Sequence, residues 1–323
     1  MRGVEEDHAH LTDLVLEGSR RGIRAVAVSL VALGLTALGQ LLVVLASGSV
    51  ALLADTVHNA ADALTAVPLL VAFRLARRPP SRRYPYGLLR AEDLAGVLIV
   101  LAIAASACLA AVESVRRLLE PRPVEQLPWV AAAGAIGFLG NEAVAWYRIR
   151  VGRRIGSAAL VADGLHARTD GLTSLGVLAG AAGTALGLER ADPIAGLAIT
   201  AAITVVLWQA SRSVLRRLLD GTDDRTVVLL EETAAAVPGV EHVTSAKARW
   251  TGHVLNAELE IQVDPTLTVE AGHRIAEEVE HALCHRLPRL AGVTVHVDPH
   301  DHRPPSGPMA HHRPAEGASR PNP

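Results

Sequence analysis

Cysteine is nearly missing from this chain of 323 residues, which contains only Cys108 and Cys284. One lies in an apolar stretch and the other in the polar C-terminal part, so the sequence supports neither a disulfide framework nor a thiolate metal cluster. Charge is also scarce: Asp, Glu, Lys and Arg make up 20% of the chain, while 50% of the residues are hydrophobic. We expect most of the chain to lie in a membrane, because this composition does not suit an ordinary soluble surface.

Sequence patterns of catalytic sites are missing as well. We find no phosphate-binding glycine loop, no nucleophile–base pair and no catalytic metal motif with an open cleft. The sequence therefore predicts no enzyme, and the lack of a nucleotide-binding domain argues against a pump driven by nucleotide hydrolysis. The N-terminus is too acidic, and too long before its first apolar run, for a cleaved signal peptide. The Arg clusters of the chain are short and lie at the ends of the apolar segments. This placement favours lipid headgroups over nucleic acid as their partner.

Long apolar runs dominate what is present. Six segments reach the roughly 20 residues that a helix needs to cross a bilayer. They cover residues 25–46, 50–73, 94–117, 128–147, 157–187 and 191–211. Arg residues gather before the first segment, in the second and fourth connections, and after the sixth, so both termini are predicted to be cytoplasmic.

This pattern predicts an all-α bundle of six transmembrane helices followed by a small α+β domain. The expected parts are a cytoplasmic N-terminal segment (1–24), a transmembrane transport domain (25–217), a cytoplasmic C-terminal dimerisation and metal-sensing domain (218–301) and a disordered tail rich in His and Pro (302–323).

Carboxylates and imidazoles recur at matched positions inside two of the apolar segments. The phrase Asp-x-x-His-x-x-x-Asp occurs twice with an offset of 108 residues, as Asp55, His58 and Asp62 and as Asp163, His166 and Asp170. Spacings of three and four residues place the three side chains of each copy on one helix face. The predicted topology puts both copies near the bilayer middle on antiparallel helices. Ionisable groups are costly there and point to an ion or proton pathway.

Divalent metals such as zinc take imidazole nitrogen and carboxylate oxygen in four-coordinate sites. Such a set would consist of His58, Asp62, His166 and Asp170. Two carboxylates would balance the charge of the metal and make its burial far less costly. Asp55 and Asp163 could fix the imidazoles by hydrogen bonds, with direct ligation and proton transfer as alternatives. Two other interpretations stay open at this point, namely polar residues that only link helices and a proton channel.

Several motifs together resemble the cation diffusion facilitator family of metal–proton antiporters. They are ADTVHNAAD and ADGLHARTD in the second and fifth apolar segments, RRYPYGLLRAEDLAG before the third, and HVDPH near the C-terminus. The resemblance implies a multi-pass homodimer in the cell membrane that exports divalent metal from the cytoplasm in exchange for protons. It implies His58, Asp62, His166 and Asp170 as the transport site. A histidine at position 58 resembles the pattern of zinc-selective members, which makes Zn²⁺ the expected substrate. Co²⁺, Fe²⁺, Cd²⁺ and Ni²⁺ are further candidate substrates.

The resemblance also implies a charge interlock at the membrane surface between Arg90 and Asp220, although ordinary interfacial charges would give the same pattern. The C-terminal part shows the order helix, strand, strand, helix, strand, over residues 226–236, 240–250, 254–263, 269–287 and 293–297. This order is similar to the metallochaperone-like cytoplasmic domain of the family.

A regulatory metal site in the C-terminal domain is the last expectation from the resemblance. Its ligands would be Glu260, His273, His296 and Asp298, and exposed polar residues without metal are the alternative. A rival function follows from this domain: a membrane-anchored metal sensor or interaction protein whose helices serve only as an anchor.

Overall fold

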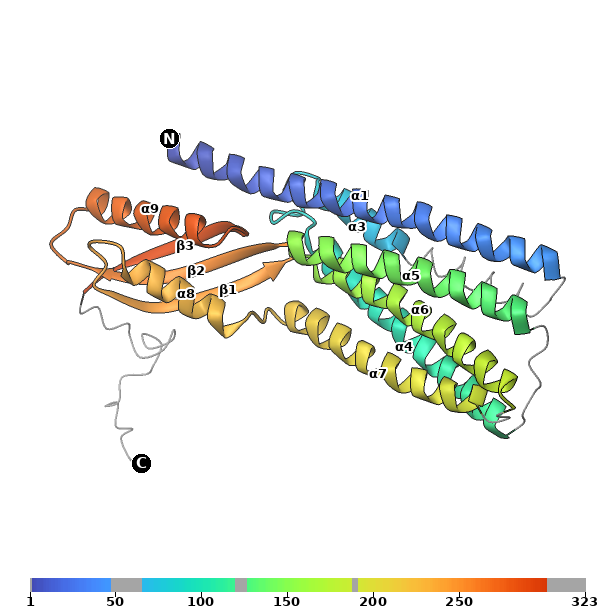
Figure 1. The fold of residues 1–323 in the computed structure, drawn as a ribbon. Helices are drawn as coiled ribbons and strands as arrows, with labels where there is room; N and C mark the ends of the chain where they lie inside the picture. Colours follow the sequence, from blue (N-terminus) through green and yellow to red (C-terminus); the bar gives the residue numbers. More distant parts are fainter. Residues whose placement is uncertain (1, 48–65, 120–126, 188–190, 301–323) are drawn as a thin grey trace, which may run out of the picture. The chain divides into compact units, whose positions relative to one another are not determined.

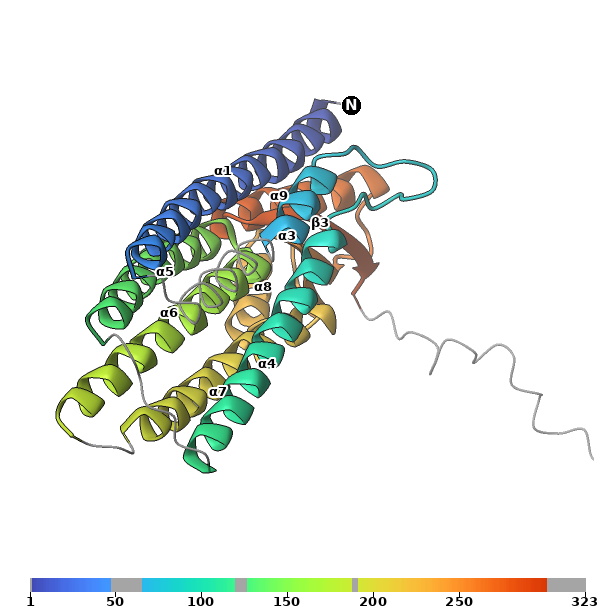
Figure 2. The ribbon, with the colours of Figure 1, turned by 90° about the vertical axis from the view of Figure 1, so that its right-hand side faces the viewer.

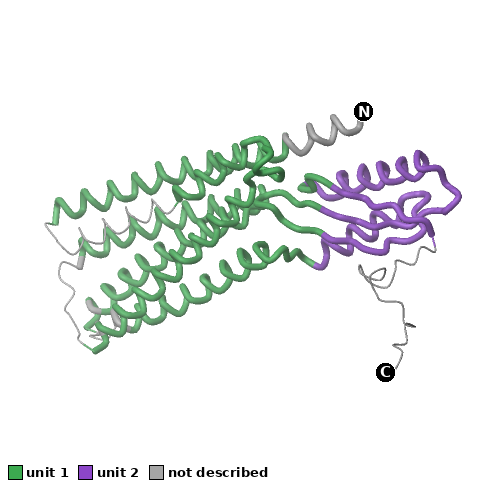
Figure 3. The backbone as a smooth tube through the Cα atoms, turned by 180° about the vertical axis from the view of Figure 1, so that it is seen from behind, with its two compact units in different colours: residues 1–223, 248–256, 289–292 green, residues 224–247, 257–288, 293–323 purple. Residues whose placement is uncertain are grey.

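The computed structural model describes residues 2–47, 66–119, 127–187 and 191–300. The chain divides into two compact units, which Figure 3 distinguishes by colour. Unit 1 consists of residues 1–223, 248–256 and 289–292, and unit 2 of residues 224–247, 257–288 and 293–323. A short hairpin tip from the C-terminal part of the sequence thus belongs to unit 1.

Unit 1 is a bundle of long helices (Figures 1 and 2). Their bounds are α1 (Arg2–Ser47), α3 (Val67–Ala76), α4 (Arg90–Leu119), α5 (Leu127–Ile155), α6 (Ala158–Ala185) and α7 (Ala191–Leu218). Helix α5 packs on both α1 and α6, and α7 packs on both α4 and α6. The helices predicted from five of the apolar segments are confirmed. Helix α1 begins well before the predicted start at residue 25, and much of the segment 50–73 lies outside the described residues.

Aliphatic side chains and one aromatic ring form the core of unit 1. Leu69 and Phe73 of α3, Ile99 and Ile103 of α4, and Leu160 of α6 are all fully buried in one cluster. Lipid tails are as apolar as these side chains, so close packing, more than exclusion of water, holds such helices together.

Large apolar side chains are exposed on the outward faces of the bundle. Leu45 of α1 is 72% exposed, Leu109 of α4 is 63% exposed and Trp208 of α7 is 68% exposed. Among the described residues, three helical stretches are long and apolar enough to cross a membrane: Asp13–Ser47, Arg90–Arg116 and Ile194–Leu218. Large exposed apolar side chains on long apolar helices suit contact with hydrocarbon. Unit 1 is therefore a membrane-embedded helical domain.

Helices α5 and α6 are long, at 29 and 28 residues, but do not belong to that apolar set. The reason lies in their composition, because charged residues interrupt both of them, including Glu142 and Arg148 in α5 and Asp163 and Arg168 in α6. The described part of the chain thus contains fewer strongly apolar spans than the six expected. These charges are matched between the two helices, as shown below.

The turn between α5 and α6 explains why one helix stops and the next begins. Gly156 has a φ of 76°, a left-handed conformation that favours glycine. Ser157 then caps the next helix, since its Oγ accepts a hydrogen bond of 3.0 Å from the Leu160 amide.

Unit 2, together with the strand residues 248–256 and 289–292 that belong to unit 1, makes up the expected α+β domain. It contains α8 (Asp224–Ala235), β1 (His242–Thr251), β2 (Val254–Val263), α9 (Val269–Arg286) and β3 (Leu290–Pro299), and the strands form a sheet in the order β1-β2-β3. The predicted order of elements is confirmed. Helices α8 and α9 pack on each other. Their buried residues Leu230, Val279 and Leu283, with Leu259 and Ile261 of the central strand, supply the apolar core.

Candidate metal site

The structure describes only the second of the two copies of the repeated motif. Asp55, His58 and Asp62 lie outside the described residues. Asp163, His166 and Asp170 lie on α6, where the side-chain exposures of His166 and Asp170 are 2% and 12%. The structure therefore describes one half of the predicted site.

His166 and Asp170 form a pair of potential metal donors. The His166 Nδ1 and Asp170 Oδ1 atoms are 3.9 Å apart, one helical turn from each other. Neither ring nitrogen of His166 has a hydrogen-bond partner among the described residues. Buried polar groups normally have partners, so a buried imidazole of this kind is suited to accept a ligand. An imidazole nitrogen beside a carboxylate oxygen is a donor set that divalent transition metals bind.

Asp163 is placed against an arginine. Its Oδ2 lies 3.0 Å from Arg148 Nη1 on α5, and both side chains are almost fully buried, at 0% and 2% exposure. The hydrogen bond from the imidazole of His166 that the sequence suggested for Asp163 is not formed in the structure. Arg148 instead supplies the charge that balances this buried carboxylate, and sequence reasoning did not single out this arginine.

Arg90 and Asp220 are brought together by the structure. Arg90 at the start of α4 and Asp220 after α7 have their Nη2 and Oδ1 atoms 2.5 Å apart. Their side chains are 43% and 49% exposed, so solvent screens the attraction between them. Arg90 also lies 3.8 Å from Asp93.

We expect loss of the Arg90–Asp220 pair to change stability by less than about 1 kcal/mol, as is usual for exposed ion pairs. Asp220→Asn removes the charge and still suits the left-handed φ of 57° at this position. Thermal unfolding in detergent of this variant, Arg90→Ala and the double variant would test the expectation. A larger loss that depends on both residues would show that the pair contributes more than ordinary interfacial charges.

The predicted ligands of the regulatory site make only local contacts. His296 Nε2 lies 3.1 Å from Asp298 Oδ1, and His273 Nε2 lies 3.4 Å from Glu277 Oε1. Glu260 contributes its backbone oxygen to a hydrogen bond with Thr244. Among the described residues of one chain, no three His, Cys, Asp or Glu side chains are placed to hold a metal ion. A regulatory site on these residues stays a prediction.

A second buried charge pair was missed by sequence reasoning. His253, at the tip of the β1–β2 hairpin, has its Nδ1 2.7 Å from Glu92 Oε2 of α4, and the two side chains are 2% and 1% exposed. Beside it, the Gly252 amide donates to Asp93 Oδ2 at 3.2 Å. Arg217 donates to the Gly252 carbonyl and lies over the Trp250 ring, 4.3 Å from its centroid. A lone His in a polar turn gave no signal of this arrangement.

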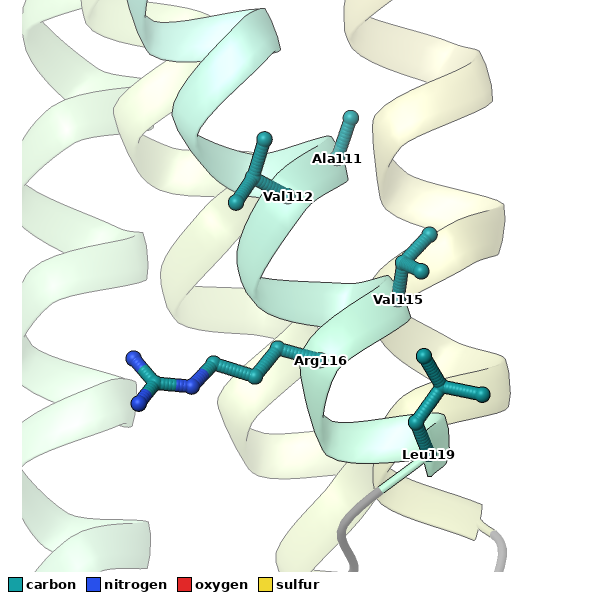
Figure 4. Close-up of a pocket in the computed structure, with 5 residues that line it drawn as sticks. All are labelled: Ala111, Val112, Val115, Arg116 and Leu119. Carbon is teal, nitrogen blue, oxygen red and sulfur yellow. The ribbon is translucent and has the colours of Figure 1, made fainter.

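A surface hollow on α4 is separate from these groups. Figure 4 shows its lining, which consists of Ala111, Val112, Val115, Arg116 and Leu119. Apolar side chains and one arginine offer no set of metal donors. Neither of the candidate metal donors His166 and Asp170 lines this hollow.

A bundle of long helices with exposed apolar faces defines a class, namely a membrane protein, and its buried imidazole and carboxylate suit a cation. Two family models match the chain: the cation efflux transmembrane domain over residues 26–219 and the cytoplasmic domain of cation efflux proteins over residues 222–300. The chain therefore belongs to the cation diffusion facilitator family, and it is a cation efflux transporter.

The chain is also similar to individual proteins. A probable cation efflux system protein of Mycobacterium tuberculosis is 56% identical over 296 residues, which cover 92% of this chain and 89% of that protein. The manganese efflux system protein MneS of Bacillus subtilis is 27% identical, over 73% of this chain and 81% of that protein. A solved structure of the MamM CTD is 36% identical, covers 24% of this chain and 95% of that chain, and gives a TM-score of 0.23.

Proposed function

We propose that this protein exports Zn²⁺ from the cytoplasm by exchange for protons. The observation that carries the proposal is the buried His166, whose ring nitrogens have no hydrogen-bond partner among the described residues, one turn from the Asp170 carboxylate. The second copy of the motif would complete the site with His58 and Asp62. Two nitrogen and two oxygen donors suit tetrahedral zinc.

Zinc is favoured over manganese by the donor set. Manganese prefers oxygen ligands, whereas imidazole suits zinc, copper, iron and nickel. His58 and His166 would give the proposed site two imidazoles. Ligand type alone does not separate zinc from the other divalent metals that bind imidazole and carboxylate, so Co²⁺, Fe²⁺, Cd²⁺ and Ni²⁺ are further candidate substrates.

Proton exchange follows from the chemistry of the same ligands. Metal binding requires neutral imidazole and ionised carboxylate, so protons and metal compete for these groups. Protons that arrive from the outer side would help release the metal, and the protonated ligands would then return to the inner side. Alternating exposure of a midplane site to the two sides of the membrane is the common scheme of secondary transporters.

The proposed setting is a homodimer of chains with six transmembrane helices in the cell membrane, with both termini in the cytoplasm. The Arg-rich connections support this orientation. The charged residues of α5 and α6 do not argue against their crossing, because Arg148 is matched by Asp163 and Glu142 by Arg168. The Arg148–Asp163 pair is buried inside the bundle, where paired charges are tolerated in membranes.

Proteoliposomes that contain the full chain and a metal-sensitive dye provide the test. We expect Zn²⁺ uptake that requires a pH gradient, stops when a protonophore collapses the gradient, and exceeds Mn²⁺ uptake. Zn²⁺ uptake at the same rate with and without the pH gradient would exclude proton antiport. Mn²⁺ uptake faster than Zn²⁺ uptake would exclude zinc as the preferred substrate. If no metal crosses and the full chain still binds metal after loss of Asp170, the protein is a membrane-anchored sensor instead.

A further inference from the structure

Helices α5 and α6 lie side by side in antiparallel orientation and in very close contact (Figures 1 and 2). Glycines allow this approach. A Cβ atom on Gly164 would lie 2.9 Å from the Ile149 amide nitrogen, and one on Gly152 would lie 2.9 Å from the Val161 amide nitrogen. Small residues at such contacts are typical of tightly packed membrane helices. This packing and the short turn between α5 and α6 already limit sliding of the two helices, and charge pairs can fix their register further.

Two ion pairs connect these helices. Arg148 and Asp163 form the fully buried pair described above, at 3.0 Å. Arg168 donates to Glu142 through Nε at 3.1 Å and through Nη2 at 2.5 Å, a two-pronged contact with 34% and 39% of the side chains exposed. Two-pronged Arg–carboxylate contacts are specific in geometry as well as strong.

The two pairs have opposite polarity. Helix α5 contributes the cation of one pair and the anion of the other, and α6 contributes the matching anion and cation. A slip of one helical turn, about 5.4 Å, would break both contacts and leave charges without partners in the membrane. Removing one partner of a buried pair is costly because the other charge remains uncompensated. The pairs therefore select one register of α6 against α5.

We propose that Arg148 and Glu142 are positioning residues for transport. Through Asp163 and Arg168 they fix α6 against α5, so that His166 and Asp170 face the metal as one preformed half of the site. Arg168 stands between these two donors in the sequence, and a turn of α6 by one residue would move both donors by about 100° around the helix. Arg148 also holds Asp163 as a counter-charge, which keeps this carboxylate out of the ligand set.

The inference rests on the proposed function for the role of His166 and Asp170, but the register of the helices can be tested without transport. A Cβ on Gly171 would lie 3.4 Å from the Asn141 Cβ, close to the range that a disulfide requires. In a chain that carries Cys108→Ser and Cys284→Ser, the pair Asn141→Cys and Gly171→Cys should cross-link readily. We expect Glu142→Arg to reduce cross-linking strongly, and the swap Glu142→Arg with Arg168→Glu to restore it.

Metal affinity gives the second readout, measured as Zn²⁺ binding to the purified full chain. By analogy with groups that orient metal ligands, we expect Arg148→Gln and Glu142→Arg each to weaken binding by about 10- to 100-fold. The compensated variants, Arg148→Gln with Asp163→Asn and the Glu142–Arg168 swap, should recover most of the affinity. If Asp163 were itself a ligand, the variant with Asp163→Asn would stay weak and the counter-charge role would be wrong.

The outcomes separate the two proposals. Restored cross-linking and restored affinity in the compensated variants support the positioning role. Cross-linking that is insensitive to Glu142→Arg, or single variants that bind Zn²⁺ as tightly as the wild type, would overturn it. If the chain with the Asn141→Cys and Gly171→Cys pair cross-links as expected and the wild-type chain moves no Zn²⁺, the proposed transport function is contradicted and the register result remains valid.

Discussion

We expect the Asp170→Asn variant to lose metal transport, with a fall in rate of at least about 100-fold. Mutation of groups that only hydrogen-bond to metal ligands already lowers metal affinity or activity by about 10- to 100-fold. Asp170 is proposed to bind the metal directly, so its loss should have a larger effect. Asparagine keeps the shape of the side chain but removes the negative charge that balances the dication. The side chain is 12% exposed, so water cannot compensate for the loss inside the bundle. Zn²⁺ uptake into proteoliposomes measures the effect.

A matched control separates this loss from general damage. Asp13→Asn makes the same chemical change on the exposed surface of α1, away from the proposed donors, and should transport as the wild type does. Both variants should purify as folded protein with equal thermal unfolding midpoints. Normal Zn²⁺ uptake by the Asp170→Asn variant would remove Asp170 from the site and contradict the proposed mechanism.

The second large effect concerns the stability of unit 1. We expect His253→Leu to lower the free energy of unfolding by about 3–5 kcal/mol, the usual cost of breaking a buried ion pair on one side. The change leaves the Glu92 carboxylate, which is 1% exposed, without its partner at 2.7 Å. The double variant His253→Leu with Glu92→Leu should regain much of the loss, since apolar replacements of both partners are often tolerated. Equal stability of wild type and His253→Leu would show that the pair contributes nothing.

The same pair predicts how stability depends on pH. Burial lowers the pKa of His253, but the hydrogen bond and charge of Glu92, together with the Val15 carbonyl, outweigh burial and Arg289, so the pKa lies above its usual value of 6.5. A raised pKa favours the charged imidazole, whose two ring nitrogens can both donate, one towards Glu92 Oε2 and one towards the Val15 carbonyl. A histidine of raised pKa stabilises the fold fully below its unfolded pKa, and this contribution is lost as pH rises through the folded pKa.

Thermal unfolding in detergent between about pH 6 and pH 9 would measure this dependence, because the range spans the titration of histidine. The wild type should lose stability as the pH rises, and the double variant His253→Leu with Glu92→Leu should lose less. A wild-type midpoint that rises with pH through this range, or an identical slope in both proteins, would contradict the assignment of the charge to His253.

Much of the local structure could be predicted from the sequence, because it depends on neighbours along the chain. Apolar runs of sufficient length predicted helices α4 to α7, and alternation predicted β1 and β2. The matched spacing of Asp163, His166 and Asp170 placed all three on one helix, as the structure has them. Exact helix ends were missed where polar residues continue a helix beyond its apolar part, as in α1, which begins at Arg2.

Pairing between distant residues was decided only by the tertiary structure. His253 meets Glu92 across 161 residues of sequence, and Arg168 meets Glu142 across 26. A charged residue in an apolar segment shows by itself that a partner must exist, since unpaired charge is costly in a membrane. It does not show which partner, because that depends on the rotation and register of two packed helices, which neither spacing nor composition specifies.

The sequence by itself thus determined the family of the protein, through several motifs along the chain, and it predicted the chemistry of the proposed metal donors from residue type and helical spacing. Only the tertiary structure decided that Asp163 faces Arg148 at 3.0 Å and that the imidazole of His166 makes no hydrogen bond among the described residues. The physical reason is that the charge partner of a buried group is set by packing between helices, and that packing depends on the shape of both surfaces at once.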